Sequence, residues 1–204
     1  MVQEDPDTPR AAADGNGEPV EERVRSARPL AVAVLALACA VAVTVDVITK
    51  QLALSQLENS APVRLLGGAI YLNVTRNSGA AFSIGGRYTV VFPIIAMIVA
   101  AAIVWMARRL RSVPWGLALG LILGGALGNL VDRLFRAPGP LRGHVVDFIS
   151  AFDQAGGVWP IFNTADSALF CGVALVLILE FSGRGRDGVR TRPAKVRDSD
   201  RAQA

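Results

Sequence analysis

The stretch "LAVAVLALACAVAVTVDVI", residues 30–48, is apolar throughout except for Thr44 and Asp46 near its end. A run of about 20 apolar residues can cross the hydrocarbon core of a bilayer as a helix, because a helix satisfies its own backbone polar groups. Three further apolar blocks follow. With their flanks, the expected spans are residues 30–48, 88–107, 113–131 and 163–181. The sequence therefore predicts a mainly α membrane protein with four transmembrane helices.

The distribution of basic residues predicts how these spans are oriented. The chain is 204 residues long and 52% hydrophobic, and its basic residues lie mainly beside the spans. Four occur in residues 1–29, three in residues 108–111 and seven after Gly183. By the positive-inside rule both termini are cytoplasmic, and the loops at about 49–87 and 132–164 face outward. The net charge of +4 thus reflects topology, and no nucleic-acid partner is expected.

The two ends of the chain lack the composition of a folded domain. Residues 1–28 are rich in Asp, Glu, Pro, Gly and Ala, and residues 182–204 are rich in Arg, so both are predicted to be disordered and cytoplasmic. Residues 29–181 then form one transmembrane domain. The first span could also be a signal peptide, with "ALAC" at Cys39 as a lipidation site. The long acidic segment before it and the apolar run beyond it favour a retained anchor helix.

Ionisable side chains at membrane depth indicate where the function lies. Each costs about 2 to 3 kcal/mol at a helix centre and persists where it has a partner or a task. Asp46 and Lys50, spaced i, i+4 at the end of the first span, can form an ion pair. At the end of the third span, in "GGALGNLVDRLFR", one helix face carries Asn129, Asp132 and Arg133. Asp132 is expected to be ionised and paired. The glycines leave a groove for another helix or a lipid chain.

Both outer loops contain a segment with strand character, and the fourth span begins with polar residues. The first loop holds "YLNVTRNSGAAFSIGG", which starts with strand-like alternation. The second holds "GHVVDFISAF", which places Asp147 between branched apolar residues if it is extended. In "WPIFNTADSALFCG", Asn163 can cap the fourth helix and Asp166 can offset its dipole. Local capping is therefore one explanation of this pair.

These carboxylates allow peptide hydrolysis by an aspartate dyad. A zinc site is not expected, because His144 is the only histidine, and Ser78 with His144 lacks the pattern of a serine peptidase. Two close carboxyl groups can share one proton, so that one activates water and the other binds the oxyanion. Asp147 and Asp166 are the expected pair, because no adjacent arginine holds either permanently charged. Asp132 is the main alternative, and no metal or other cofactor is expected.

A function from another class is also possible on these residues, a small proton-coupled transporter whose intramembrane carboxylates relay protons. Such a transporter needs polar residues along a path through the bilayer. Here the polar residues are expected to gather at one membrane face, and the second and fourth spans have apolar middles.

Five short blocks, in this order around the four spans, resemble those of the bacterial lipoprotein signal peptidases, or signal peptidase II. They are "DVITK" at 46–50, "RNSGAAFS" at 76–83, "GGALGNLVDR" at 124–133, "VVDFI" at 145–149 and "FNTADSALFCG" at 162–172. The resemblance covers residues 30–181. It implies an intramembrane aspartic peptidase of the bacterial cell membrane, surrounded by lipid. Its substrates are prolipoproteins, cut just before the diacylglyceryl-modified cysteine, and its expected inhibitor is the cyclic peptide globomycin.

The resemblance also implies roles for individual residues. The catalytic aspartates fall on Asp147 and Asp166, at the outer membrane face. Supporting or substrate-binding positions fall on Asp46, Lys50, Asn77, Asn129, Asp132, Arg133 and Asn163. The family fold adds a small extracytoplasmic β-cradle, expected largely from residues 58–85, and a mobile outer segment at residues 134–160.

Overall fold

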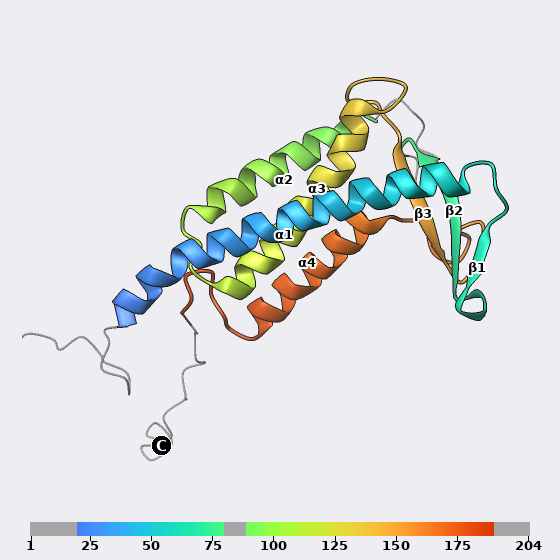
Figure 1. Cartoon of the computed structure of the whole chain (residues 1–204). Helices are drawn as coiled ribbons and strands as arrows, with labels where there is room; N and C mark the ends of the chain where they lie inside the picture. The colour runs from blue at the N-terminus through green and yellow to red at the C-terminus, as the bar shows by residue number, and fades with distance from the viewer. Residues whose placement is uncertain (1–19, 80–88, 190–204) are drawn as a thin grey trace, which may run out of the picture.

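Four helices run side by side in the computed structural model, and a small sheet lies at one end of them (Figure 1). The structure describes residues 20–79 and 89–189, with side chains from Arg28 onward. The helices are α1 (Val20–Leu57), α2 (Val91–Ala107), α3 (Val113–Phe135) and α4 (Thr164–Phe181). The strands are β1 (Val63–Leu65), β2 (Ile70–Asn77) and β3 (Val145–Ala151), and the 3-10 turn η1 (Leu66–Gly68) joins the first two. The chain is thus mainly helical, as the sequence predicts.

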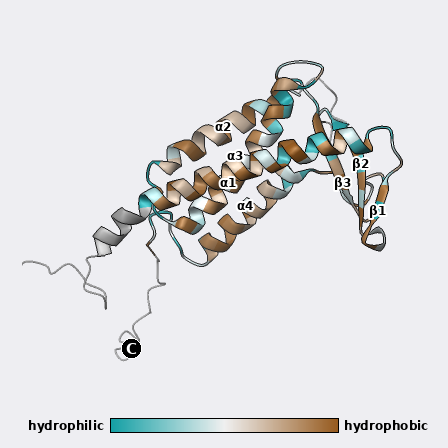
Figure 2. Cartoon of the chain, viewed as in Figure 1, coloured by the Kyte–Doolittle hydropathy of each residue, from teal (hydrophilic) through white to brown (hydrophobic). Residues whose placement is uncertain are grey.

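The apolar blocks of the sequence are the helices of the structure. Among the described residues, three helices are long and apolar enough to cross a membrane: Arg28–Leu57 within α1, and the whole of α3 and α4. The α2 helix is also apolar but has 17 residues. Figure 2 shows hydrophobic colour along the helices and hydrophilic colour where α1 and α3 approach the sheet. Polar side chains of α1 and α3 therefore lie where these helices meet the sheet.

The helix boundaries extend beyond the apolar blocks. The α1 helix begins at Val20, so it includes residues 20–28, which the sequence assigns to the disordered extension. It also continues to Leu57, and α3 continues about one turn past the expected end, to Phe135. The flanks contain good helix formers such as Glu, Leu, Gln and Arg, so a helix does not have to end where the apolar run ends.

Some expectations concern residues outside the described part of the chain. These are residues 1–19 and 190–204 of the two expected tails, residues 80–85 of the first outer loop, and the expected start of the second span at Tyr88. Residues 182–189, which the sequence assigns to the disordered tail, are described. The backbone oxygen of Arg186 accepts hydrogen bonds from the amides of Arg111, at 3.0 Å, and Ser112, at 3.2 Å. This first part of the tail therefore packs against the link between α2 and α3.

The glycines of α3 bring neighbouring helices into close contact. A Cβ atom at Gly120 would lie 2.5 Å from the backbone oxygen of Leu35 in α1. At Gly125 it would lie 2.4 Å from the backbone oxygen of Ala165 in α4. Other helices therefore fill the groove predicted along α3, as small residues allow in membrane packing.

The sheet is antiparallel, with the strand order β1-β2-β3. The strands predicted in the two outer loops are confirmed as β2 and β3. Because β3 belongs to the second loop, the sheet is not formed by residues 58–85 alone, and residues 145–151 of the expected mobile segment form a strand. Asn77 pairs with Val145, and Thr75 pairs with Asp147. This register places Asn77 and Asp147 close together, and they form the first part of the candidate site.

Candidate active site

The pairing of β2 with β3 places Asn77 beside Asp147. Asn77 lies opposite Val145, two residues before Asp147, so the two side chains are diagonal neighbours on one face of the sheet. Asn77 Nδ2 donates to Asp147 Oδ2 at 2.8 Å. Asn77 Oδ1 accepts from the amide of Gly79 at 2.7 Å, which fixes the orientation of the side-chain amide. The Asp147 carboxylate is buried, with 2% of the residue exposed.

The start of α4 lies against the same strand. Phe162 and Ile149 exchange two backbone hydrogen bonds of 2.9 Å. The next residue, Asn163, therefore lies beside β3 and close to Asp147. Asn163 Oδ1 accepts from the amide of Asp166 at 2.9 Å, and Asp166 Oδ2 accepts from the amide of Asn163 at 3.1 Å. This is a capping box, and the capping explanation of the two residues is confirmed.

Capping uses only the oxygen of the Asn163 side chain. Its Nδ2 atom donates to Asp147 Oδ1 at 2.6 Å and to Asn129 Oδ1 at 3.1 Å. Asn129 Nδ2 in turn donates to Asp166 Oδ1 at 2.8 Å. The two aspartates predicted from the sequence are therefore brought together, with Asn163 in contact with both.

The surroundings of these two carboxylates suit a shared proton. Among the described residues, neither Asp147 nor Asp166 forms an ion pair with a lysine or arginine, and side-chain amides donate to both. Burial raises the pKa of Asp147 to about 6, and the nearby Asp166 carboxylate acts in the same direction, whereas the hydrogen bond from Asn77 opposes the shift. Asp166 is half-buried and so more accessible. Such a pair can hold one proton between two acids.

A buried charged cluster supports the pair from the side of α1. Lys50 Nζ lies 2.7 Å from Asp46 Oδ2, 2.9 Å from Asp132 Oδ2 and 3.0 Å from Asn129 Oδ1. The contact with Asn129 is a hydrogen bond, and the contacts with the two carboxylates are ion pairs. The ion pair predicted between Asp46 and Lys50 is confirmed, and both residues are fully buried. Because Lys50 binds the oxygen of Asn129, the amide nitrogen of Asn129 points toward Asp166.

Asp132 is paired, but not with the arginine next to it in the sequence. It contacts Lys50 at 2.9 Å and forms a close ion pair with Arg136, and its Oδ2 accepts from the amide of Val146 at 3.2 Å. Both oxygens of this carboxylate therefore lie against a cation, whereas those of Asp147 accept from side-chain amides.

Arg133 joins backbone segments on the other side of the site. Its Nη1 atom donates to the backbone oxygens of Asn77, at 3.2 Å, and Gly143, at 3.1 Å. Its guanidinium lies 5.5 Å from the centre of the Phe92 ring. Arg133 thus ties the end of β2 to the loop before β3, which keeps Asn77 near Asp147.

Three residues of this network, Thr164, Ala165 and Arg136, were not predicted from the sequence. Asp46 Oδ1 accepts from Thr164 Oγ1 and from the amide of Ala165, both at 2.9 Å, and Arg136 binds Asp132. The i, i+4 spacing of Asp132 and Arg136 was a usable signal. No sequence pattern indicated the contact of Asp46 with Thr164, because these residues are far apart in the chain. In the described part of the chain, no cluster of three or more His, Cys, Asp or Glu residues could hold a metal ion.

Comparison with known proteins identifies the family. The family model described as "Signal peptidase (SPase) II" matches residues 38–182, which is more than half of the chain. The lipoprotein signal peptidase of Mycobacterium tuberculosis (strain ATCC 25618 / H37Rv) is 46% identical over 190 residues, covering 93% of this chain and 90% of that protein. The lipoprotein signal peptidase of Streptomyces coelicolor is 44% identical over 196 residues, covering 90% and 93% respectively.

Solved structures agree with this result. A bacterial membrane enzyme determined by the in meso method at 1.9 Å resolution has a TM-score of 0.63 and 30% sequence identity, covering 73% of this chain and 93% of its own. A second, determined at 2.3 Å, has a TM-score of 0.62 and 27% identity, covering 81% and 96%. The apolar helices and these relatives together indicate a multi-pass membrane protein. The chain belongs to the signal peptidase II family of aspartic peptidases.

Proposed function

We propose that this protein is a membrane-embedded aspartic endopeptidase that removes signal peptides from prolipoproteins, with Asp147 and Asp166 as its catalytic residues. The observation that carries the proposal is that Asn163 contacts both carboxylates, Asp147 through its side-chain nitrogen and Asp166 through its backbone amide, at one end of the helices in a chain of the signal peptidase II family. The names of the relatives, lipoprotein signal peptidases, supply the substrate class.

The proposed mechanism assigns different protonation states to the two aspartates. The raised pKa of Asp147 favours it as the carboxyl group that holds the proton. Asp166, which is half-buried, then acts as the base that takes a proton from the attacking water. The Asp147 proton forms a hydrogen bond with the developing oxyanion of the scissile carbonyl. As the intermediate collapses and the C–N bond breaks, Asp166 passes the proton that it took from water to the leaving amine.

The proposed placement in the membrane follows from the positions of charged and apolar residues. All four helices span the bilayer, and the 17 residues of α2 are at the short end of the roughly 17 to 25 that suffice. The α2–α3 link carries Arg108, Arg109 and Arg111 and lies at the opposite end of the helices from the sheet (Figure 1). By the positive-inside rule this link and both termini are cytoplasmic. The sheet and the two aspartates then lie at the outer face of the bacterial cell membrane.

The proposed substrate is a prolipoprotein carrying a diacylglyceryl-modified cysteine, cut just before that cysteine. A dyad at the end of a helical bundle fits this chemistry, because the lipid anchor would hold the scissile bond at the membrane surface. Membrane lipid surrounds the helices, and globomycin is the expected inhibitor, on the family resemblance of the five sequence blocks.

The transporter alternative is not supported. The family of the chain is a peptidase family, and its relatives are named as peptidases. The buried polar network also lies at one end of the helices, whereas the middles of α2 and α4 are apolar. A proton path across the bilayer would need polar residues along its length.

The proposal is tested by a gel-shift processing assay with a lipidated prolipoprotein and the purified full chain. Asp147→Asn and Asp166→Asn should each abolish cleavage, and globomycin should inhibit the unaltered enzyme. Asp153→Asn is the control, because Asp153 Oδ2 accepts from the amide of Gly157 and has no contact with the network. Cleavage by both dyad variants would refute the mechanism. An inactive Asp132→Asn variant beside an active Asp147→Asn variant would reassign the dyad.

A further inference from the structure

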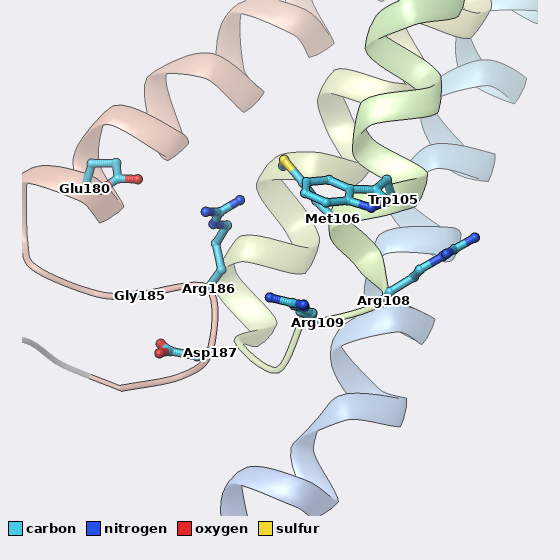
Figure 3. A pocket seen from close by; sticks show the side chains of 8 residues that line it. All are labelled: Trp105, Met106, Arg108, Arg109, Glu180, Gly185, Arg186 and Asp187. Atoms are coloured by element: carbon cyan, nitrogen blue, oxygen red, sulfur yellow. The ribbon is translucent and has the colours of Figure 1, made fainter.

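A cavity of about 590 Å³ lies at the end of the helices opposite the sheet (Figure 3). Its walls are the end of α2, the α2–α3 link, the end of α4 and the segment that follows α4. The volume lies within the range of roughly 300 to 1,000 Å³ that is typical of small-molecule sites. The candidate active site contains none of these residues, so the cavity needs a separate explanation.

The C-terminal wall of this cavity is held by specific contacts. The backbone oxygen of Arg186 accepts from the amides of Arg111 and Ser112, and that of Arg184 accepts from Trp115 Nε1 at 2.7 Å. The guanidinium of Arg186 lies 5.9 Å from the centre of the Trp115 ring, and Trp115 is itself buried. The Arg186 side chain is therefore oriented by a residue that belongs to the apolar core.

Five of the eight residues that line the cavity are charged, and they lack ionic partners in the described part of the chain. The lining contains Arg108, Arg109 and Arg186 together with Glu180 and Asp187, which leaves one positive charge in excess. Within residues 28–79 and 89–189, none of these five side chains takes part in an ion pair. Figure 3 shows Arg109 extending from the link toward the C-terminal segment, and Arg186 extending from that segment to the side away from Asp187. The charges match a ligand with one negative charge and additional hydrogen-bond donors.

The surroundings of the cavity indicate a lipid as the source of such a ligand. Trp105, which is 67% exposed, lines the cavity at the end of α2. Exposed tryptophans at helix ends are typical of the membrane interface, where phospholipid head groups lie. Basic pockets between membrane helices on the cytoplasmic side bind such head groups.

We propose that this cavity binds the head group of a phospholipid with one phosphate and free hydroxyl groups, the chemistry of phosphatidylglycerol. The phosphate accepts hydrogen bonds from Arg109 and Arg186, which are strong because both partners are charged. The glycerol hydroxyls donate to the carboxylates of Glu180 and Asp187. Trp105 contacts the glycerol and the first part of the acyl chains. The proposal does not depend on the peptidase reaction, since the cavity shares no residue with the aspartate network.

The test is native mass spectrometry of the full chain in detergent, with phosphatidylglycerol or phosphatidylcholine added at equal concentration. The unaltered protein should retain more phosphatidylglycerol than phosphatidylcholine. The double variant Arg109→Gln/Arg186→Gln should reduce the retained phosphatidylglycerol about tenfold, since it removes two charge-assisted contacts. The control Arg28→Gln/Arg111→Gln removes the same charge from exposed residues outside the cavity and should keep at least half of the binding.

A second variant distinguishes lipid binding in the cavity from general electrostatic attraction to the protein. Trp105→Ala leaves the charge unchanged and should also lower phosphatidylglycerol retention. Equal losses in the two double variants, with no loss in Trp105→Ala, would show attraction by charge alone and overturn the proposal. Equal retention of the two lipids would overturn it too. Displacement by deacylated glycerophosphoglycerol at the same concentration would show a phosphate site and overturn its assignment to a lipid.

Discussion

Asn163 Nδ2 donates to Asp147 Oδ1 at 2.6 Å, so the residue that caps α4 also holds the carboxylate on β3. One side chain thus uses its oxygen for the helix and its nitrogen for the candidate dyad. The two roles can be separated by experiment, because a hydroxyl can replace the oxygen but is too short to replace the distant nitrogen.

Asn163→Ser is therefore expected to keep the cap and lose activity. Serine is a good N-cap residue, so its unfolding temperature should stay close to that of the unaltered protein. Asn163→Ala should be destabilised by about 1 kcal/mol, the usual cost of a lost cap. Both variants should cleave at least about tenfold more slowly in the processing assay, because the hydrogen bond that positions the Asp147 carboxyl group is lost. Full activity of Asn163→Ser would contradict the positioning role.

The pH dependence of cleavage should depend on Asn77. Because the pKa of Asp147 is about 6, kcat/KM is expected to fall as pH rises above this value and the pair loses its last proton. The hydrogen bond from Asn77 lowers this pKa, so Asn77→Ala should move the alkaline limb of the profile to higher pH.

Asn73→Ala is the matched control for that measurement. Asn73 also lies on β2, but its side chain donates to the backbone oxygen of Gln154 at 3.2 Å and leaves Asp147 untouched. Its profile should coincide with that of the unaltered enzyme. A limb that stays in place or moves to lower pH in Asn77→Ala would exclude Asp147 as the group that titrates.

The stability of the protein should also change with pH through Asp147. Its pKa in the folded state is about 6, above the ordinary value of about 3.9. The folded state therefore binds this proton more tightly, and the stability that results is present below about pH 4 and lost as pH rises through 6. The loss amounts to roughly 3 kcal/mol, at about 1.4 kcal/mol for each pKa unit. Thermal unfolding in detergent should show a smaller decrease between pH 4.5 and 8 for Asp147→Asn.

Asp153 supplies a control of the opposite sign. The hydrogen bond from the backbone amide of Gly157 lowers the pKa of Asp153, so its contribution to stability is present at neutral pH and lost as pH falls. Asp153→Asn should therefore leave intact the loss of stability that occurs as pH rises from about 4 through 6. If Asp147→Asn and Asp153→Asn gave the same profile as the unaltered protein, Asp147 would not be the origin of that loss.

Removal of the buried cation Lys50 should destabilise the fold far more than removal of the exposed cation Arg76. Lys50→Met leaves Asp46 without its ammonium partner and Asp132 with Arg136 alone, and breaking a buried pair costs about 3 to 5 kcal/mol. Arg76→Gln breaks the exposed pair with Glu58 and should cost at most about 1 kcal/mol. Unfolding temperatures of the two variants make the comparison. Similar values would mean that the cluster around Lys50 does not stabilise the fold.

Features with a short sequence separation were predictable. The apolar blocks predicted the helices, since the length of each block is close to the thickness of a bilayer. The i, i+4 spacing of Asp46 and Lys50 predicted their ion pair. The alternation in the first outer loop predicts β2, the branched apolar residues around Asp147 are compatible with β3, and the spacing of Asn163 and Asp166 predicts the capping box. In each case the pattern lies within one short segment of the chain.

Contacts between distant segments could not be derived in this way. Asn77 meets Asp147 only because the register of β2 and β3 is interrupted between Leu72 and Thr75, and no local pattern sets that shift. Asp132 has Arg133 beside it in the sequence, yet it binds Lys50 of another helix. The helical geometry of α3 directs neighbouring residues to different sides, so adjacency in the chain was a poor guide to pairing.

The position of Asn163 and Asp166 in the last helix also sets the order in which the site is completed during synthesis. Once α3 has entered the membrane, Asp46, Lys50 and Asp132 can already meet, because all three belong to α1 and α3. The second carboxylate and its asparagine are added only with α4. On the proposed assignment of the dyad, a nascent chain can therefore pair these buried charges first and complete its catalytic site last.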